Sequence, residues 1–234
     1  LFLEKQHAVY LEKAFSEKRL QLYKDRDFVA LTERILNPSL TEFKVPDEVD
    51  ATLRPYQVTG YKWLRTLAEN ELGGILADDM GLGKTLQSIV FIASALLESK
   101  EKGEEAPHFL IVCPTSLTYN WLDEFENFAP FINAIVISGT PIERKELIEE
   151  YKKYDVLITS YPLIRRDIKS YEAINFNTVF IDEAQFIKNN SSQNAKSVKR
   201  LKARHKYALT GTPIENSLSE LWSIFDFILR GYLH

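Results

Sequence analysis

The stretch GLGKT, residues 81–85, combines residue types that bind the phosphates of a nucleotide. Gly81 and Gly83 let main-chain N–H groups turn toward phosphate oxygens, because glycine adopts backbone conformations that other residues avoid. Lys84 supplies a positive charge, and the Thr85 hydroxyl can ligate Mg²⁺. A glycine-rich turn without a ligand is the alternative, but it leaves the Lys-Thr pair at a helix start unexplained. The sequence therefore predicts a site for ATP, or a similar triphosphate, and Mg²⁺.

Two adjacent acids, Asp182 and Glu183, follow a hydrophobic run in the stretch TVFIDEAQ, residues 178–185. Acids are also common in the first turn of a helix, where they interact favourably with the helix dipole, so the pair alone does not indicate catalysis. With a phosphate loop upstream, the pair has the chemistry that phosphate hydrolysis needs. Asp182 is predicted to hold Mg²⁺, and Glu183 is predicted to orient the attacking water.

These candidate residues lie in a chain where short β-branched runs alternate with helical patterns. Strands are predicted at 73–77, 108–113, 133–138, 155–160, 178–182 and 206–210, and helices at 84–98, 115–128, 141–152, 161–170, 191–202 and 216–229. Such alternation predicts an α/β fold with a mostly parallel sheet covered by helices on both faces. The candidate residues follow strand ends, and in open α/β sheets ligands bind at that edge.

The N-terminal part of the chain has a different pattern. Residues 1–36 carry apolar side chains at helical spacing, with no Gly or Pro before Pro38, and predict a helix. Residues 37–52 contain two prolines and predict a linker. The predicted organisation is a helical segment and linker over residues 1–45 and one ATP-binding domain over residues 46–234.

Composition limits the class of protein. No apolar run approaches the roughly 20 residues that cross a bilayer, which argues against a membrane role. The single cysteine, Cys113, cannot form an internal disulfide and fits a reducing compartment. A net charge of −4 argues against a surface coated for non-specific nucleic-acid binding. One basic run, residues 196–206, remains a candidate for nucleic-acid contact or a solvated helix face. The chain does not begin with Met and stops after a helical pattern, so we expect a piece of a longer protein.

Six stretches resemble, in order, the superfamily-two helicases and, more closely, their Swi/Snf-type DNA-translocating ATPases. They are LRPYQVTGYKWL (53–64), DDMGLGKT (78–85), VCPTSLTYNW (112–121), LITSYPLIRRD (157–167), IDEAQ (181–185) and LTGTPIEN (209–216). The resemblance covers residues 46–234 and implies a RecA-like three-layer fold, the N-terminal lobe of a two-lobed ATPase. An acid-acid lead into the phosphate loop is the form that this family uses, but the sequence does not explain the physical role of Asp78.

The resemblance also implies roles for residues outside the phosphate loop and acid pair. Gln57 would read the adenine edge, since an amide both donates and accepts hydrogen bonds, and Arg54 and Tyr56 would shape that pocket. Without the family, RPYQ is an ordinary helix start. The further nucleotide-binding residues that the resemblance implies are Asp79, Met80 and Leu82.

Two further groups of residues carry weaker signals. Ser116 and Ser160 would contact the DNA backbone, although serines at helix starts are more often simple caps. The resemblance implies that four residues couple the nucleotide state to DNA: Gln185, Thr210, Gly211 and Thr212. Gln185 stands where many relatives carry His, so we expect altered coupling and not its loss. A plain strand, turn and helix would also explain residues 209–216.

The implied partners are double-stranded DNA, a second RecA-like lobe of the same protein, and a DNA-bound protein complex. The second lobe would supply arginines, each worth about 10³–10⁵ in rate, so the chain alone should hydrolyse ATP very slowly. The implied location is the cytoplasm of a bacterium or the nucleus of a eukaryote. Two alternatives stay open, a strand-separating helicase and a non-catalytic protein-binding module. The intact phosphate loop and acid pair argue against the second.

Overall fold

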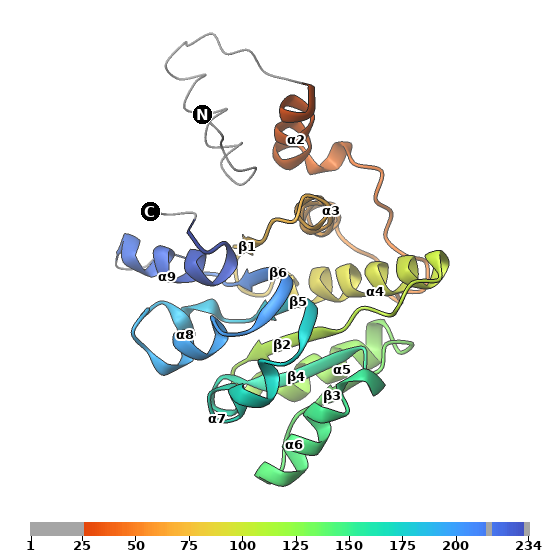
Figure 1. Ribbon diagram of the computed structural model, residues 1–234. Coiled ribbons are helices and arrows are strands. Elements are labelled where there is room, and N and C mark those ends of the chain that lie inside the picture. The colour runs from red at the N-terminus through yellow and green to blue at the C-terminus, as the bar shows by residue number, and fades with distance from the viewer. Residues whose placement is uncertain (1–25, 214–216, 232–234) are drawn as a thin grey trace.

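A six-stranded sheet forms the centre of the computed structural model, which describes residues 26–213 and 217–231 (Figure 1). The strands lie in the order β1-β6-β5-β2-β4-β3, and all neighbouring pairs are parallel. Their bounds are β1 Gly74–Leu76, β2 Phe109–Cys113, β3 Ala134–Val136, β4 Val156–Ser160, β5 Asn175–Ile181 and β6 Lys202–Leu209. All six predicted strands are therefore present, and the parallel sheet is confirmed.

Helices cover both faces of the sheet and make three layers. One face packs against α3 (Pro55–Glu69), α4 (Lys84–Lys102) and α5 (Thr118–Phe128); the other packs against α6 (Pro141–Glu149), α7 (Tyr161–Tyr171), α8 (Gln193–Val198) and α9 (Leu218–Ile228). Side chains alternate along each strand, so Phe109 and Ile111 of β2 join the first core while Leu110 and Val112 join the second. Burial of both strand faces explains why these strands read as continuous apolar runs.

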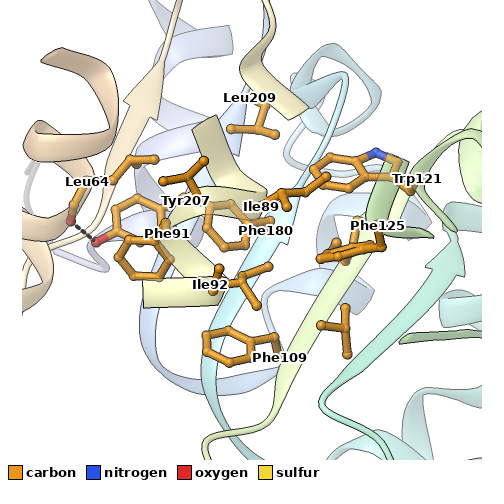
Figure 2. Packing of buried hydrophobic residues seen from close by; sticks show 14 of the residues in the cluster. Leu64, Ile89, Phe91, Ile92, Phe109, Trp121, Phe125, Phe180, Tyr207 and Leu209 are labelled. Atoms are coloured by element: carbon orange, nitrogen blue, oxygen red, sulfur yellow. Dashed lines mark hydrogen bonds between the residues drawn. The ribbon is translucent and has the colours of Figure 1, made fainter. Parts of the chain in front are cut away.

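Aromatic rings gather in the core between α4 and the neighbouring strands β5 and β6 (Figure 2). Phe91 of α4 packs edge-on against Phe180 and Tyr207, with ring centroids 5.7 and 5.5 Å away. Phe180 and Tyr207, on neighbouring strands β5 and β6, have centroids 5.3 Å apart. The cluster therefore joins α4 to both strands and fixes the relative positions of the loops at their ends.

We expect Tyr207→Phe to lower the free energy of unfolding by about 1–2 kcal/mol, because it removes one buried hydrogen bond. The Tyr207 hydroxyl donates to the main-chain oxygen of Leu64 in α3 at 2.9 Å (Figure 2). Urea denaturation of the variant and the parent measures the difference. Tyr119→Phe is the matched control, since Tyr119 is 57% exposed. Equal stability of all three chains would show that the Tyr207 bond contributes nothing.

The predicted helices are present with shifted ends, and the one predicted at 191–202 is only half as long as predicted. The helix there is only α8, six residues long, and β6 already begins at Lys202. The reason is tertiary pairing: β5 begins earlier than predicted, and its residues Asn175 and Phe176 pair with Lys202 and Ala203. A partner strand thus overrides local helix preference. Helix α3 was not among the predicted helices, although it begins at the stretch RPYQ, which was interpreted as a helix start.

This correction also changes the interpretation of the basic run at 196–206. It is not one helix face, because it continues from α8 through a turn into β6. Three of its charges are paired: Lys199 with Asp226 at 2.9 Å, Arg200 with Glu172 at 2.6 Å and Arg204 with Glu71 at 3.4 Å. The run therefore carries less free positive charge than its composition indicates.

Part of the predicted N-terminal helix is present as α2 (Arg26–Leu36), and residues 1–25 lie outside the described residues. The predicted linker, 37–52, packs along α3. The Lys44 main-chain oxygen accepts a hydrogen bond from the Tyr61 hydroxyl at 2.9 Å, and the Arg65 guanidinium lies 4.9 Å from the Phe43 ring centre. Within the described ranges, no helix combines the length and apolar character that a bilayer span requires.

Candidate nucleotide-binding site

The phosphate loop, residues 78–85, joins the end of β1 to the start of α4, as its sequence predicts. Gly81 and Gly83 have φ angles of +81° and +76°, a region that other residues rarely adopt. A Cβ atom at Gly83 would also lie 2.4 Å from Nε2 of Gln57, so a side chain there would have to displace the Gln57 amide. The loop is therefore built for exposed main-chain N–H groups at the N-terminus of α4, where anions bind.

Lys84 lies across the loop. Its Nζ atom donates to the main-chain oxygens of Asp78 at 2.7 Å and Asp79 at 3.0 Å. These partners are neutral, so the ammonium charge is available to an anion that approaches the loop. Thr85 follows in the first turn of α4, partly buried.

The structure gives Asp78 a role that the sequence did not. Its Oδ2 atom accepts a hydrogen bond from Nε2 of Gln87 at 3.0 Å, while its main-chain oxygen accepts from Lys84. Gln87 is fully buried one turn into α4. Asp78 therefore ties the end of β1 to α4 and fixes both ends of the phosphate loop.

Gln57 lies directly beside the phosphate loop. Its Oε1 atom accepts from the main-chain N–H of Arg54 at 2.8 Å, and its Nε2 atom donates to the main-chain oxygen of Leu82 at 3.2 Å. One amide proton and one oxygen lone pair remain for a ligand. Tyr56 is 37% exposed and lines a groove of about 870 Å³ that runs along β1 to Asp78.

The acid pair lies at the end of β5, at the same sheet edge as the loop (Figure 1). Asp182 is 8% exposed; its Oδ1 atom accepts from the Glu183 N–H at 2.8 Å and its Oδ2 atom from Nε1 of Trp121 at 3.0 Å. Burial raises the pKa of Asp182, while these two donors and the charge of Lys84 act in the opposite direction. Glu183 has a φ of +50°, an uncommon conformation that often marks functional sites.

A chain of hydrogen bonds joins the acid pair to the loop after β6. Glu183 Oε2 accepts from Nε2 of Gln185 at 2.7 Å, and Gln185 Oε1 accepts from the Thr210 hydroxyl at 3.3 Å. The Thr210 oxygen in turn accepts from the N–H of Thr212 at 3.1 Å. Three of the four predicted coupling residues, Gln185, Thr210 and Thr212, thus form one chain of hydrogen bonds that begins at Glu183.

The same loop lies against the phosphate loop. A Cβ atom at Gly211 would lie 3.0 Å from Cγ of Met80, so Gly211 permits a close approach. Residues 214–216 of the predicted motif lie outside the described residues.

These residues fit a magnesium nucleotide better than a bare metal ion. Within residues 26–213 and 217–231, no group of three His, Cys, Asp or Glu side chains could hold a metal by itself. Mg²⁺ commonly binds through one or two carboxylates together with substrate phosphates and water. One buried carboxylate that is close enough to Lys84 for its charge to lower the carboxylate pKa is the arrangement that this mode of binding needs.

The two serines predicted to contact DNA differ. Ser116 is exposed in the 3₁₀ helix η3 (Thr115–Leu117), at the end of β2. Ser160 ends β4 and is only 1% exposed, with its hydroxyl enclosed by protein. The Ser160 side chain therefore does not lie at the surface, because a hydroxyl at the last position of a strand inside the sheet is covered by its neighbours. Its contact with the DNA backbone stays a prediction.

Sequence reasoning missed two residues that contact Asp182. Trp121 donates to its carboxylate, and the Tyr161 hydroxyl donates to its main-chain oxygen at 2.7 Å. Both residues lie in stretches that carry the family resemblance, VCPTSLTYNW and LITSYPLIRRD. An aromatic residue at helical spacing usually indicates core packing, so only the fold shows these polar contacts.

Comparisons with known proteins agree with this geometry. The profile of the SNF2-related domain matches residues 56–234. The TATA-binding protein-associated factor MOT1 of Saccharomyces cerevisiae is 43% identical over 218 residues, which cover 90% of this chain and 12% of that protein. The putative ATP-dependent helicase/translocase YwqA of Bacillus subtilis is 43% identical over 197 residues, covering 83% of this chain and 21% of that protein.

Solved structures show the same fold. The Sulfolobus solfataricus SWI2/SNF2 ATPase core in complex with dsDNA superposes with a TM-score of 0.70 and 38% sequence identity, over 81% of this chain and 38% of that chain. The same core domain alone gives a TM-score of 0.68. The RecA-like fold is thereby confirmed. The chain spans only a minor part of the length of each of these relatives.

Proposed function

Because this chain belongs to the SNF2-related family, we propose that it is the first ATPase lobe of a double-stranded-DNA translocase that remodels DNA–protein complexes. The observation that carries the proposal is the placement of Lys84, Asp182 and Glu183 at one edge of the sheet. The related SWI2/SNF2 core binds dsDNA, which supports duplex DNA as the partner. A second lobe of the same protein would complete the enzyme, since this chain covers 38% of that core.

The phosphate loop would hold the ATP phosphates through its main-chain N–H groups. Lys84 would exchange its bonds to the carbonyl oxygens of Asp78 and Asp79 for bonds to phosphate. Since both present bonds go to neutral oxygens, an anionic partner is favoured by charge. Asp79, Met80 and Leu82 would line the outer side of the loop.

Asp182 and the Thr85 hydroxyl would hold Mg²⁺, which neutralises charge on the phosphates when bound. Glu183 would orient and deprotonate the attacking water. Its bond to Gln185 fixes one carboxylate oxygen and leaves the other free for that water. The Gln185 bond to Thr210 would let Glu183 respond to the loop after β6, where the second lobe or DNA would act.

We expect Gln57→Ala to weaken ATP binding about tenfold and to reduce the preference for ATP over GTP, since one lost buried hydrogen bond to a ligand is worth about 1 kcal/mol or more. Gln57 both supports the Leu82 carbonyl and would contact adenine. Equilibrium titration with fluorescent ATP and GTP analogues measures both effects. Thr59→Ala, an exposed change on the same helix, is the control. If the ratio of ATP affinity to GTP affinity is unchanged, Gln57 does not recognise the base.

The proposal is tested by ATP hydrolysis in the full-length protein, with and without duplex DNA. Stimulation by duplex, together with displacement of a third strand from triplex DNA, is the expected result for a translocase. Separation of a duplex into single strands would instead favour the strand-separating helicase. Absence of hydrolysis with and without DNA would favour a non-catalytic protein-binding module. The 234-residue chain alone is expected to be nearly inactive.

A further inference from the structure

Two buried aromatic residues hold Asp182 from different helices. The indole N–H of Trp121, in α5, donates to Oδ2 at 3.0 Å, and the hydroxyl of Tyr161, in α7, donates to the main-chain oxygen at 2.7 Å. The N–H of Glu183 donates to Oδ1 at 2.8 Å. Because both carboxylate oxygens and the carbonyl oxygen are bonded, these donors set the orientation of the carboxylate.

Helix α5 connects the exposed segment η3, which follows the end of β2, to this carboxylate. It follows η3 directly, in which Thr115 and Ser116 are exposed, and the Thr118 hydroxyl donates to the Thr115 carbonyl at 3.0 Å. Trp121 lies in the next turn and is 1% exposed, packed against Phe125 with ring centroids 6.2 Å apart (Figure 2). Since a short helix moves as a rigid element, a displacement of η3 would move the Trp121 indole relative to Asp182.

Helix α7 makes a second connection of the same kind. The Tyr161 ring stacks on Phe186, with centroids 5.1 Å apart and the planes inclined by 5°. Phe186 follows the acid pair in sequence and is 46% exposed. A surface contact at Phe186 would therefore act on Tyr161, and through its hydroxyl on the main chain of Asp182.

We propose that Trp121 is a positioning residue that couples DNA contact at residues 115–117 to the orientation of the Asp182 carboxylate, with Tyr161 as a second connection. This inference rests on the proposed function and deepens it. Ser116 touches the DNA backbone, η3 and α5 move together, and the indole N–H turns the carboxylate toward the bound magnesium nucleotide. DNA thereby changes the rate of hydrolysis without touching the nucleotide.

A purely structural role for Trp121 predicts something different. A buried indole N–H needs an acceptor, and any nearby carbonyl would satisfy that need. Here the acceptor is a buried carboxylate 61 positions away, at the candidate magnesium site. Packing alone should therefore be separable from coupling by a change that removes the N–H and keeps the ring.

The test replaces Trp121 with 3-benzothienylalanine, in which sulfur takes the place of the indole N–H. In the full-length protein, we expect the ratio of ATPase rates with and without duplex DNA to fall about tenfold, a typical coupling between two sites. Tyr161→Phe removes the second connection and is expected to lower the same ratio. Phe125→Leu is the matched control on α5, since it changes packing in the same buried cluster and leaves the polar contact.

A spectroscopic readout complements the rates. Trp121 labelled with 5-fluorotryptophan and assigned by its replacement with Phe should shift its ¹⁹F resonance when duplex DNA is added without nucleotide. The labelled Trp63, in α3, should not shift. Asp182→Asn should change the Trp121 resonance even without DNA, because it alters the acceptor.

The outcomes separate the two proposals. If DNA does not stimulate the wild-type protein, the proposed function fails. If DNA stimulates the wild-type protein but the sulfur analogue keeps the full ratio, the function stands and the coupling through Trp121 is wrong. An unmoved ¹⁹F resonance in a protein that DNA stimulates also overturns the coupling. If Phe125→Leu lowers the ratio of ATPase rates as much as the sulfur analogue does, Trp121 contributes packing alone.

Discussion

Glu183→Gln is expected to lower the DNA-stimulated ATPase rate of the full-length protein by about 10²–10⁴-fold, the usual contribution of a general base. The substitution keeps the size of the side chain, and an amide oxygen can still accept the hydrogen bond from Gln185. It removes only the ability to take a proton from water. Affinity for ATP should therefore change little, which separates a catalytic loss from a binding loss.

Glu124→Gln is the matched control for this change. Glu124 is a second partly buried acid near Asp182, and burial together with the Asp182 charge raises its pKa. The same isosteric change is made there without touching the chain of bonds from Glu183 to Thr210. Single-turnover rates and nucleotide affinities of both variants decide the assignment. If Glu124→Gln loses the activity and Glu183→Gln keeps it, the base is misassigned.

The parts that could be predicted from sequence are those whose signals are local. A strand such as FLIVC, residues 109–113, is fully buried and reads as one apolar run because helices cover both of its faces. The phosphate loop is equally local, since its positive φ angles need glycine at fixed positions. The end of each strand then places the acid pair and the loop at one edge, because parallel strands share their direction.

The parts that could not be predicted depend on partners distant in sequence. Trp121 and Asp182 are 61 positions apart, and neither residue type indicates that they form a hydrogen bond. The end of α8 was misplaced for a similar reason, since Lys202 enters a strand only because β5 provides its partner. Ser160 is a further case, because its position in a motif does not indicate that the fold leaves the residue only 1% exposed.

These limits define what the family resemblance adds. It identifies the stretches that matter, but the hydrogen bonds within them come from the fold. Gln57 illustrates this, because the resemblance implies contact with adenine, whereas the structure shows two bonds to main-chain atoms, at Arg54 and Leu82. Its side chain therefore supports the phosphate loop in addition to any contact with the base.

Lys84→Met is expected to lower the DNA-stimulated ATPase rate by about 10²–10³-fold. Removing one hydrogen-bond donor that stabilises charge in a transition state has an effect of this size in other enzymes. Methionine keeps an apolar chain of similar length and removes the ammonium group. Its two hydrogen bonds, to the carbonyl oxygens of Asp78 and Asp79, disappear together with its charge. Unlike Glu183→Gln, this variant should also bind ATP more weakly, because the loop then holds phosphate with main-chain dipoles alone.

Lys62→Met is the matched control, since Lys62 makes the same kind of contact away from the site. Its Nζ atom donates to the main-chain oxygens of Thr41 at 2.7 Å and Ser39 at 3.3 Å, so its loss also removes an ammonium bonded to two carbonyls. Thermal melts, ATP titrations and steady-state rates are compared for both variants. We expect Lys62→Met to change stability modestly and to keep ATP affinity, because it only joins residues 39–41 to α3. If both variants lose ATP affinity equally, the effect of Lys84 is one of folding, and the phosphate loop loses its strongest support as a nucleotide site.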